Sequence, residues 1–362
     1  MDAPPRVSIL DQSPVPEGST GSDALHNSID LARLADRLGY ARYWIAEHHA
    51  TPMLASASPE VLIAAIAART TRLRVGSGGV MLPHYSPLKV AETFSILSGL
   101  YPGRIDLGLG RAPGSDPQTM LALQRDRRHV APDDFPEQLA ELLGYLDDSF
   151  PHGHPLARLA ALPGGPETPE PWLLGSSPQS GIWAAELGLP YSFADFINPN
   201  GAPIAARYRH EFARSDRASA PYVAVAVSAV CAETDEEADL VAASVRMAIT
   251  LLGRGRLIKV PPVDEARRWL DAYDLRDVPA NRRAVVGSPE RVRRELERVV
   301  EEYGADELMI VTITYDHAHR RRSYELIADE LGLEPAAQAT AEQMEAPPTG
   351  VGSAPCEPRV GL

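Results

Sequence analysis

Eight short apolar segments alternate along the chain with segments whose apolar residues recur at helical spacing. This alternation predicts a parallel sheet covered by helices on both faces, because strands buried on both faces read as continuous apolar runs. Eight such units favour closure into a (β/α)8 TIM barrel, which usually takes about 250 residues and more with insertions. We expect the strands at residues 7–10, 43–46, 73–79, 105–109, 172–174, 191–194, 222–231 and 307–314.

An open, doubly wound sheet is the alternative arrangement of the same units. No Gly-x-Gly-x-x-Gly follows the first strand, which counts against the dinucleotide-binding version of that fold. Two insertions, residues 112–170 and 252–290, interrupt the alternation after the fourth and seventh strands, and such connections are commonly lids or disordered segments. From Pro335 onward the chain lacks periodicity. We therefore expect a barrel domain at residues 1–334 and a disordered tail at 335–362.

The charge of the chain excludes some partners. Its 362 residues carry a formal net charge of −14, so sequence-independent binding to nucleic acid is not expected. No apolar run reaches the ~18 residues of a membrane span, and no signal peptide is evident, so we expect a cytoplasmic protein without a membrane anchor. Cys231 and Cys356 form no motif, and Cys231 is expected to be a buried apolar residue.

Active sites of barrel enzymes lie at the carboxyl ends of the strands, so the residues that follow each strand are the candidates. Glu47, His48 and His49 follow the second strand. Neighbouring residues on an extended segment point in opposite directions, so one imidazole should face the site. That ring could serve as a general base, and Glu47 could orient a ring or raise its pKa. A solvated or helix-capping histidine is the alternative. Two adjacent histidines cannot readily chelate one ion, so no metal is expected.

Three further post-strand segments suit a flat, phosphorylated ligand. Gly78 and Gly79 allow close approach to the backbone, or else form a tight corner. Arg111 can pair bidentately with phosphate, or else form a salt bridge at the rim.

The third segment joins the fifth strand to a helix and contains Ser176, Ser177 and Ser180. Serine followed by Pro178 suits a helix start, whose free N–H groups could receive phosphate; a plain N-cap is the alternative. Arg111 and this helix start follow neighbouring strands, so they could converge on one phosphate. Asp11, Gln12, Ser13 and Asp195 are the other post-strand candidates.

Several strings together resemble the bacterial luciferase-like monooxygenase family, in the right order over about residues 6–331. They are Glu47-His48-His49, residues 103–111, residues 183–190 with Ile197-Asn198, and Gly287-Ser288-Pro289-Glu290. The resemblance implies that His48 is the active-site histidine. It also implies that Arg111, Ser177 and Ser180, with Ser176 beside them, contact the phosphate of FMN. Gly78-Gly79 matches a non-prolyl cis peptide under the flavin ring, and residues 252–290 match a mobile lid.

The reaction implied by the resemblance uses reduced FMN from a separate flavin reductase. The flavin reacts with O₂ to give a C4a-peroxyflavin, which oxygenates a small organic substrate, and the protein is expected to be a homodimer. Light emission is not expected, because Gly110 stands where luciferases carry a bulkier, reactive residue. Two alternatives remain: an F420-dependent hydride-transfer oxidoreductase on the same barrel, and a flavin-binding subunit without catalysis.

Overall fold

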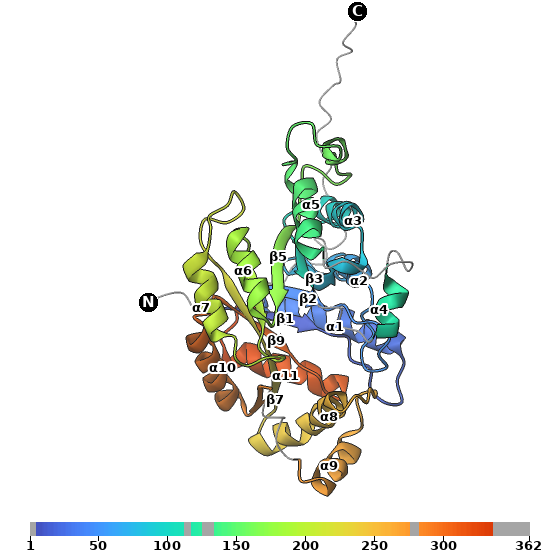
Figure 1. Ribbon diagram of the computed structural model, residues 1–362. Helices are drawn as coiled ribbons and strands as arrows, with labels where there is room; N and C mark the ends of the chain where they lie inside the picture. Colours follow the sequence, from blue (N-terminus) through green and yellow to red (C-terminus); the bar gives the residue numbers. More distant parts are fainter. Residues whose placement is uncertain (1–4, 112–116, 125–133, 276–281, 336–362) are drawn as a thin grey trace, which may run out of the picture.

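Eight parallel strands close into a barrel in the computed structural model, which describes residues 5–111, 117–124, 134–275 and 282–335 (Figure 1). The strands run in the order β1, β2, β3, β4, β5, β6, β7 and β9, and a pairing of β9 with β1 completes the ring. The predicted barrel is therefore confirmed. Its strands are β1 (Arg6–Asp11), β2 (Arg42–Ile45), β3 (Arg74–Met81), β4 (Ile105–Gly110), β5 (Glu170–Gly175), β6 (Tyr191–Ala194), β7 (Val223–Cys231) and β9 (Glu307–Val311).

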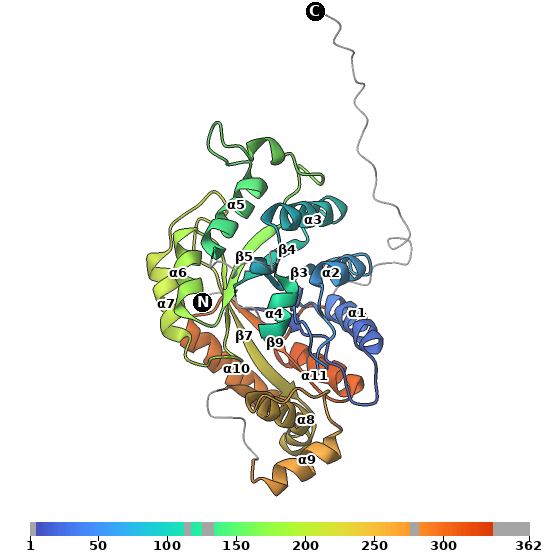
Figure 2. The ribbon, with the colours of Figure 1, turned by 45° about the vertical axis from the view of Figure 1, so that its right-hand side comes forward.

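Helices surround the barrel, as Figure 2 shows. Local signals explain their ends: Thr20 caps α1 in a reciprocal pair with Asp23, and Gly39 ends it with a φ of 92°. The helices of the βα units are α1 (Gly21–Leu38), α2 (Pro59–Ala67), α3 (Pro87–Leu100), α6 (Pro178–Glu186), α7 (Ala202–Glu211), α8 (Asp235–Gly253), α10 (Pro289–Tyr303) and α11 (His317–Glu330). None of the helices within the described ranges combines the length and the apolarity needed to cross a membrane.

Both insertions contain helices. The first holds α4 (Pro117–Leu123) and α5 (Phe135–Asp147), and α5 packs beside α3 (Figure 1). The second holds α9 (Val263–Ala272), which packs on α8, and a ninth strand, β8 (Ala284–Gly287). The strand β8 was not among the predicted strands; it pairs with the last residues of β7, beyond the part that pairs with β6. Residues 336–362 of the predicted tail lie outside the described residues.

The interior of the barrel is layered. At the floor, where the strands begin, Arg42 lies close to Asp106 and Glu307, and all three side chains are buried. Above them Trp44 and Trp172 pack edge to face, with ring centroids 5.0 Å apart. The guanidinium of Arg42 lies 4.7 Å from the centre of the Trp172 ring. These layers fill the lower barrel, so a cavity for small molecules can form only toward the carboxyl ends of the strands.

Candidate functional site

Two adjoining chambers, each of about 380 Å³, lie at the carboxyl ends of the strands. The inner chamber lies over the barrel axis and reaches down to Leu10, Trp44 and Met309. The outer chamber lies beside it, under α8. Gln12, His48, Phe196 and Ile197 line both chambers and form their shared wall.

All eight predicted site residues line the inner chamber: Glu47, His48, Gly78, Gly79, Arg111, Ser176, Ser177 and Ser180. They come from the ends of β2, β3, β4 and β5, as expected for parallel strands that finish at the same edge. The chain therefore brings the whole set to one cavity. Residues absent from the predicted set also line it, among them Gln179, Trp183 and Phe196.

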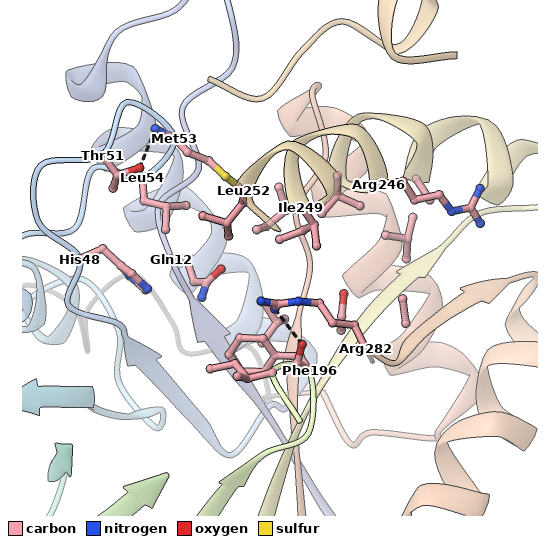
Figure 3. Close-up of a pocket in the computed structure, with 18 of the residues that line it drawn as sticks. Gln12, His48, Thr51, Met53, Leu54, Phe196, Arg246, Ile249, Leu252 and Arg282 are labelled. Carbon is pink, nitrogen blue, oxygen red and sulfur yellow. Dashed lines mark hydrogen bonds between the residues drawn. The ribbon is translucent and has the colours of Figure 1, made fainter. Parts of the chain in front are cut away.

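His48 belongs to the shared wall of the two chambers, and its ring points toward Gln12, as Figure 3 shows. Its Nδ1 atom is enclosed and has no hydrogen-bond partner among the described residues. Burial, helped by the neighbouring charge of His49, lowers the pKa of His48 from 6.5 to about 4. The imidazole is therefore neutral at physiological pH and available to a ligand.

Glu47 is directed away from His48. Its Oε1 lies 2.7 Å from Nε2 of His49 and accepts a hydrogen bond from the Tyr85 hydroxyl at 2.9 Å. Its Oε2 accepts from the backbone N–H of Met81 at 2.9 Å. Of the two rings that Glu47 could orient, its carboxylate contacts that of His49.

Glycines of β3 and β4, Gly78, Gly79 and Gly110, line one side of the inner chamber. The Gly78–Gly79 peptide bond is cis and non-prolyl, as the family resemblance implies. A Cβ on Gly79 would lie 2.7 Å from the carbonyl oxygen of Gly108, closer than packing allows. A Cβ on Gly110 would meet nothing within 4 Å, so that position opens onto the cavity.

Arg111 and the start of α6 lie on one side of the inner chamber. The guanidinium of Arg111 lies 5.7 Å from the centre of the Trp183 ring, and Trp183 belongs to α6. Ser177 is the N-cap of α6, and its side chain makes no capping hydrogen bond within the described residues. The first-turn N–H groups of a helix have no intrahelical acceptor, so this end can receive an anion. Asn198 steadies the turn by donating to the carbonyl of Ser176 at 2.9 Å.

Ser180 has hydrogen bonds of its own. Its hydroxyl donates to the carbonyl of Ser177 at 2.9 Å and lies 3.1 Å from the Tyr191 hydroxyl. The Ser180 hydroxyl is thus engaged within the protein, and its backbone N–H is the group that a ligand at the helix start would use.

Three other post-strand candidates serve the fold. Asp11 is buried and lies 2.5 Å from the Arg320 guanidinium, and it also accepts a hydrogen bond from the N–H of Ser13. Burial alone would raise the pKa of Asp11, but Arg320 and the hydrogen bonds lower it below its ordinary value. Asp195 is buried and accepts a hydrogen bond from the Tyr303 hydroxyl at 2.7 Å. The fourth candidate, Gln12, lines both chambers.

Sites of this construction at the mouth of a barrel are typical of enzymes that hold a phosphorylated ligand above the barrel axis. The chain belongs to the luciferase-like monooxygenase family, whose model matches residues 6–307. This assignment places it among the oxidoreductases.

Relatives match over most of their length. The chain is 43% identical to a luciferase-like monooxygenase of Escherichia coli strain K12, over 89% of this chain and 96% of the relative. It is 37% identical to the N-acetyl-S-alkylcysteine monooxygenase of Bacillus subtilis strain 168, over 90% and 97%. The crystal structure of apo-MsnO8 superposes with a TM-score of 0.83, is 41% identical, and covers 92% of this chain and 100% of that one.

More distant structures share the fold alone. One is the oxygenating constituent of 3,6-diketocamphane monooxygenase from Pseudomonas putida in complex with FMN, with a TM-score of 0.69 and 20% identity over 92% of this chain and 100% of that one. Another is the coenzyme F420-dependent tetrahydromethanopterin reductase from Methanopyrus kandleri, with a TM-score of 0.61 and 15% identity over 91% of this chain and 98% of that one.

Proposed function

We propose that this protein is an FMN-dependent monooxygenase, which takes reduced FMN from a separate flavin reductase and uses O₂ to oxygenate a small organic substrate. The observation that carries the proposal is the convergence of Arg111, the start of α6 and His48 on one chamber that is partly lined by glycine.

The residues present fit the proposed cofactor. Arg111 and the first-turn N–H groups of α6 supply positive charge and donors for a phosphate, as helix starts and arginines commonly do. Gly79 admits no side chain next to Gly108, and Gly110 leaves open space, so a flat ring system can approach the backbone there.

In the proposed enzyme, reduced FMN supplies the electrons that activate O₂. Arg111 and Ser177 hold its phosphate, with Ser176 shaping the turn and Ser180 donating its backbone N–H. His48, neutral in the folded protein, accepts or returns a proton beside the ring. Glu47 acts as a positioning residue through His49. The apolar walls keep water away, which limits loss of the oxidising equivalents as peroxide.

A separate reductase is part of the proposal because the family resemblance implies one. We further propose that the protein works in the cytoplasm and as a homodimer, in line with the family resemblance. A relative is named as an N-acetyl-S-alkylcysteine monooxygenase, so compounds of that class are among the first substrates to try.

Cofactor titration tests the proposal. The purified protein is titrated with FMN, with FMN reduced under anaerobic conditions, and with F420. We expect binding of reduced FMN, and a loss of about 10- to 100-fold in Arg111→Gln, because a hydrogen-bonded charge contributes about 1.5–3 kcal/mol. Arg298→Gln, which removes a similar charge from the exposed face of α10, is the matched control. Tight binding of F420 together with no binding of FMN would mean a hydride-transfer enzyme instead.

Turnover separates an enzyme from a flavin-binding subunit. Consumption of O₂ and incorporation of labelled oxygen into product are followed with excess reduced FMN. His48→Gln is expected to keep its affinity for FMN and to lose turnover by about 10²- to 10⁴-fold, the range of general acid–base catalysis. Full turnover in this variant would remove His48 from the mechanism.

A further inference from the structure

The outer chamber has a mostly apolar lining, and three arginines, Arg246, Arg282 and Arg283, also line it. Its size lies within the range of small-molecule sites, about 300–1,000 Å³, and corresponds to roughly a dozen non-hydrogen atoms at about 30 Å³ each. The apolar wall comes from the segment after β2, from α8 and from the ends of β7, β8 and β9: Met53, Leu54, Val230, Val245, Ile249, Leu252, Val286 and Ile313.

Two of the three arginines are paired with carboxylates. Arg246 lies 2.6 Å from Asp239, and Arg283 lies 2.8 Å from Glu302 and 3.4 Å from Asp195. Their charges are therefore largely neutralised by the protein.

Arg282 differs from its two neighbours. It donates one hydrogen bond, to the carbonyl of Phe196 at 3.2 Å, and no carboxylate of the described chain forms an ion pair with it. Burial without a compensating negative charge lowers the pKa of Arg282. Partial burial of a guanidinium without a counter-charge costs free energy, and a bound anion would offset that cost.

The position of Arg282 indicates where that anion would sit. Figure 3 shows its guanidinium extending toward Gln12, on the side of His48. Its partner Phe196 belongs to the shared wall of the two chambers. An anion on Arg282 therefore lies next to the inner chamber, with the apolar wall under α8 beyond it.

We propose that the outer chamber binds the organic substrate, and that Arg282 selects a carboxylate on it. The substrate class is a monocarboxylate with an apolar body of roughly ten non-hydrogen atoms, packed against α8. This inference deepens the proposed function and rests on it for the chemistry, but carboxylate binding itself needs no flavin.

Isothermal titration calorimetry of the full-length protein without flavin tests the proposal, with octanoate as the probe and its neutral isostere octanamide as the control. We expect octanoate to bind more tightly than octanamide. Arg282→Gln should weaken octanoate by about 10- to 100-fold and leave octanamide unchanged, the loss expected for a hydrogen bond between charged groups. Unchanged octanamide binding also reports that the variant is folded. Arg282→Lys should recover part of the affinity, and Arg298→Gln should leave it unchanged.

Three outcomes would overturn the proposal. The first is equal affinity of the wild-type protein for octanoate and octanamide, or no octanoate binding. The second is unchanged octanoate affinity in Arg282→Gln. The third is a loss of FMN affinity in Arg282→Gln without a change for octanoate, which would assign this arginine to the cofactor. Failure of the proposed function is distinguishable from these outcomes. In that case FMN does not bind the wild-type protein, while the octanoate titrations still measure the role of Arg282.

Discussion

Nη1 of Arg42 lies 2.9 Å from Oδ2 of Asp106 at the floor of the barrel, and both side chains are almost completely buried. Arg42 also lies 3.2 Å from Glu307, while Arg74 pairs with the other oxygen of Asp106. Charges from four different strands thus balance one another where the strands begin.

The floor cluster predicts a large loss of stability when its central cation is removed. Arg42→Met should lower the free energy of unfolding by about 3–5 kcal/mol, because it removes the cation that pairs with Glu307 and one of the two that pair with Asp106, and both carboxylates are buried. Arg298→Met, which breaks the exposed pair with Glu295 on α10, should cost about 0–1 kcal/mol. Urea unfolding of both variants measures the difference, and similar losses in the two would contradict the role of the floor cluster.

The neutral state of His48 predicts a specific pH dependence. Its pKa is about 4 in the folded protein and near 6.5 when exposed, so the unfolded chain takes up the proton first as the pH falls. Neutral His48 therefore does not lower the free energy of unfolding above pH 6.5. Between pH 6.5 and pH 4 the free energy of unfolding falls by up to about 3 kcal/mol, at 1.36 kcal/mol per pKa unit.

The comparison is made between the wild-type protein and His48→Gln at pH 7.5 and pH 4.5. The stability of the wild type should fall by about 2–3 kcal/mol more than that of the variant, because other titrating groups are common to both. Equal losses of stability in the two proteins would show that folding does not lower the pKa of His48.

Two glycines of the inner chamber predict opposite responses to a methyl group. Gly79→Ala should cost about 1–3 kcal/mol, because its Cβ would lie 2.7 Å from the Gly108 carbonyl oxygen and the backbone of β4 would have to move. Gly110→Ala should stay within about 0.5 kcal/mol of the wild type, because the added atom meets nothing within 4 Å. Urea denaturation midpoints measure both; a tolerated Gly79→Ala would show that β4 yields easily.

The position of Glu47 predicts a mainly structural effect. Glu47→Gln should cost about 1–3 kcal/mol, because the amide nitrogen cannot accept the hydrogen bonds that Tyr85, Met81 and His49 direct at the carboxylate. Tyr85→Phe removes one of these donors and should cost less, about 0.5–1.5 kcal/mol. Thermal unfolding provides the ranking, and a reversed order would mean that the hydroxyl of Tyr85 matters more than the carboxylate.

The barrel was predictable because each of its strands is a local apolar run. β7 is apolar along almost its whole length, and such a strand can be recognised without knowing its neighbours. β8 was missed for the opposite reason. Its four residues, Ala284–Gly287, follow two arginines, and what makes them a strand is the overhanging end of β7.

The location of the site followed from topology, whereas side-chain directions did not. Parallel strands end at one edge, so Arg111 and Ser177 were expected to share a cavity, and they do. That Glu47 turns to His49 depends on Met81 and Tyr85, which lie more than thirty residues further along the chain. Arg282 lay in a stretch interpreted as an insertion, and only the structure shows that no carboxylate of the described residues pairs with it.

The sealed floor also determines how molecules travel. Arg42 and its partners fill the barrel below, and the two tryptophans pack edge to face above them, so nothing can pass through the barrel from end to end. In the proposed enzyme, flavin and substrate would therefore have to enter and leave at the same end of the barrel. A flavin in the inner chamber and a substrate in the outer chamber would share one entrance.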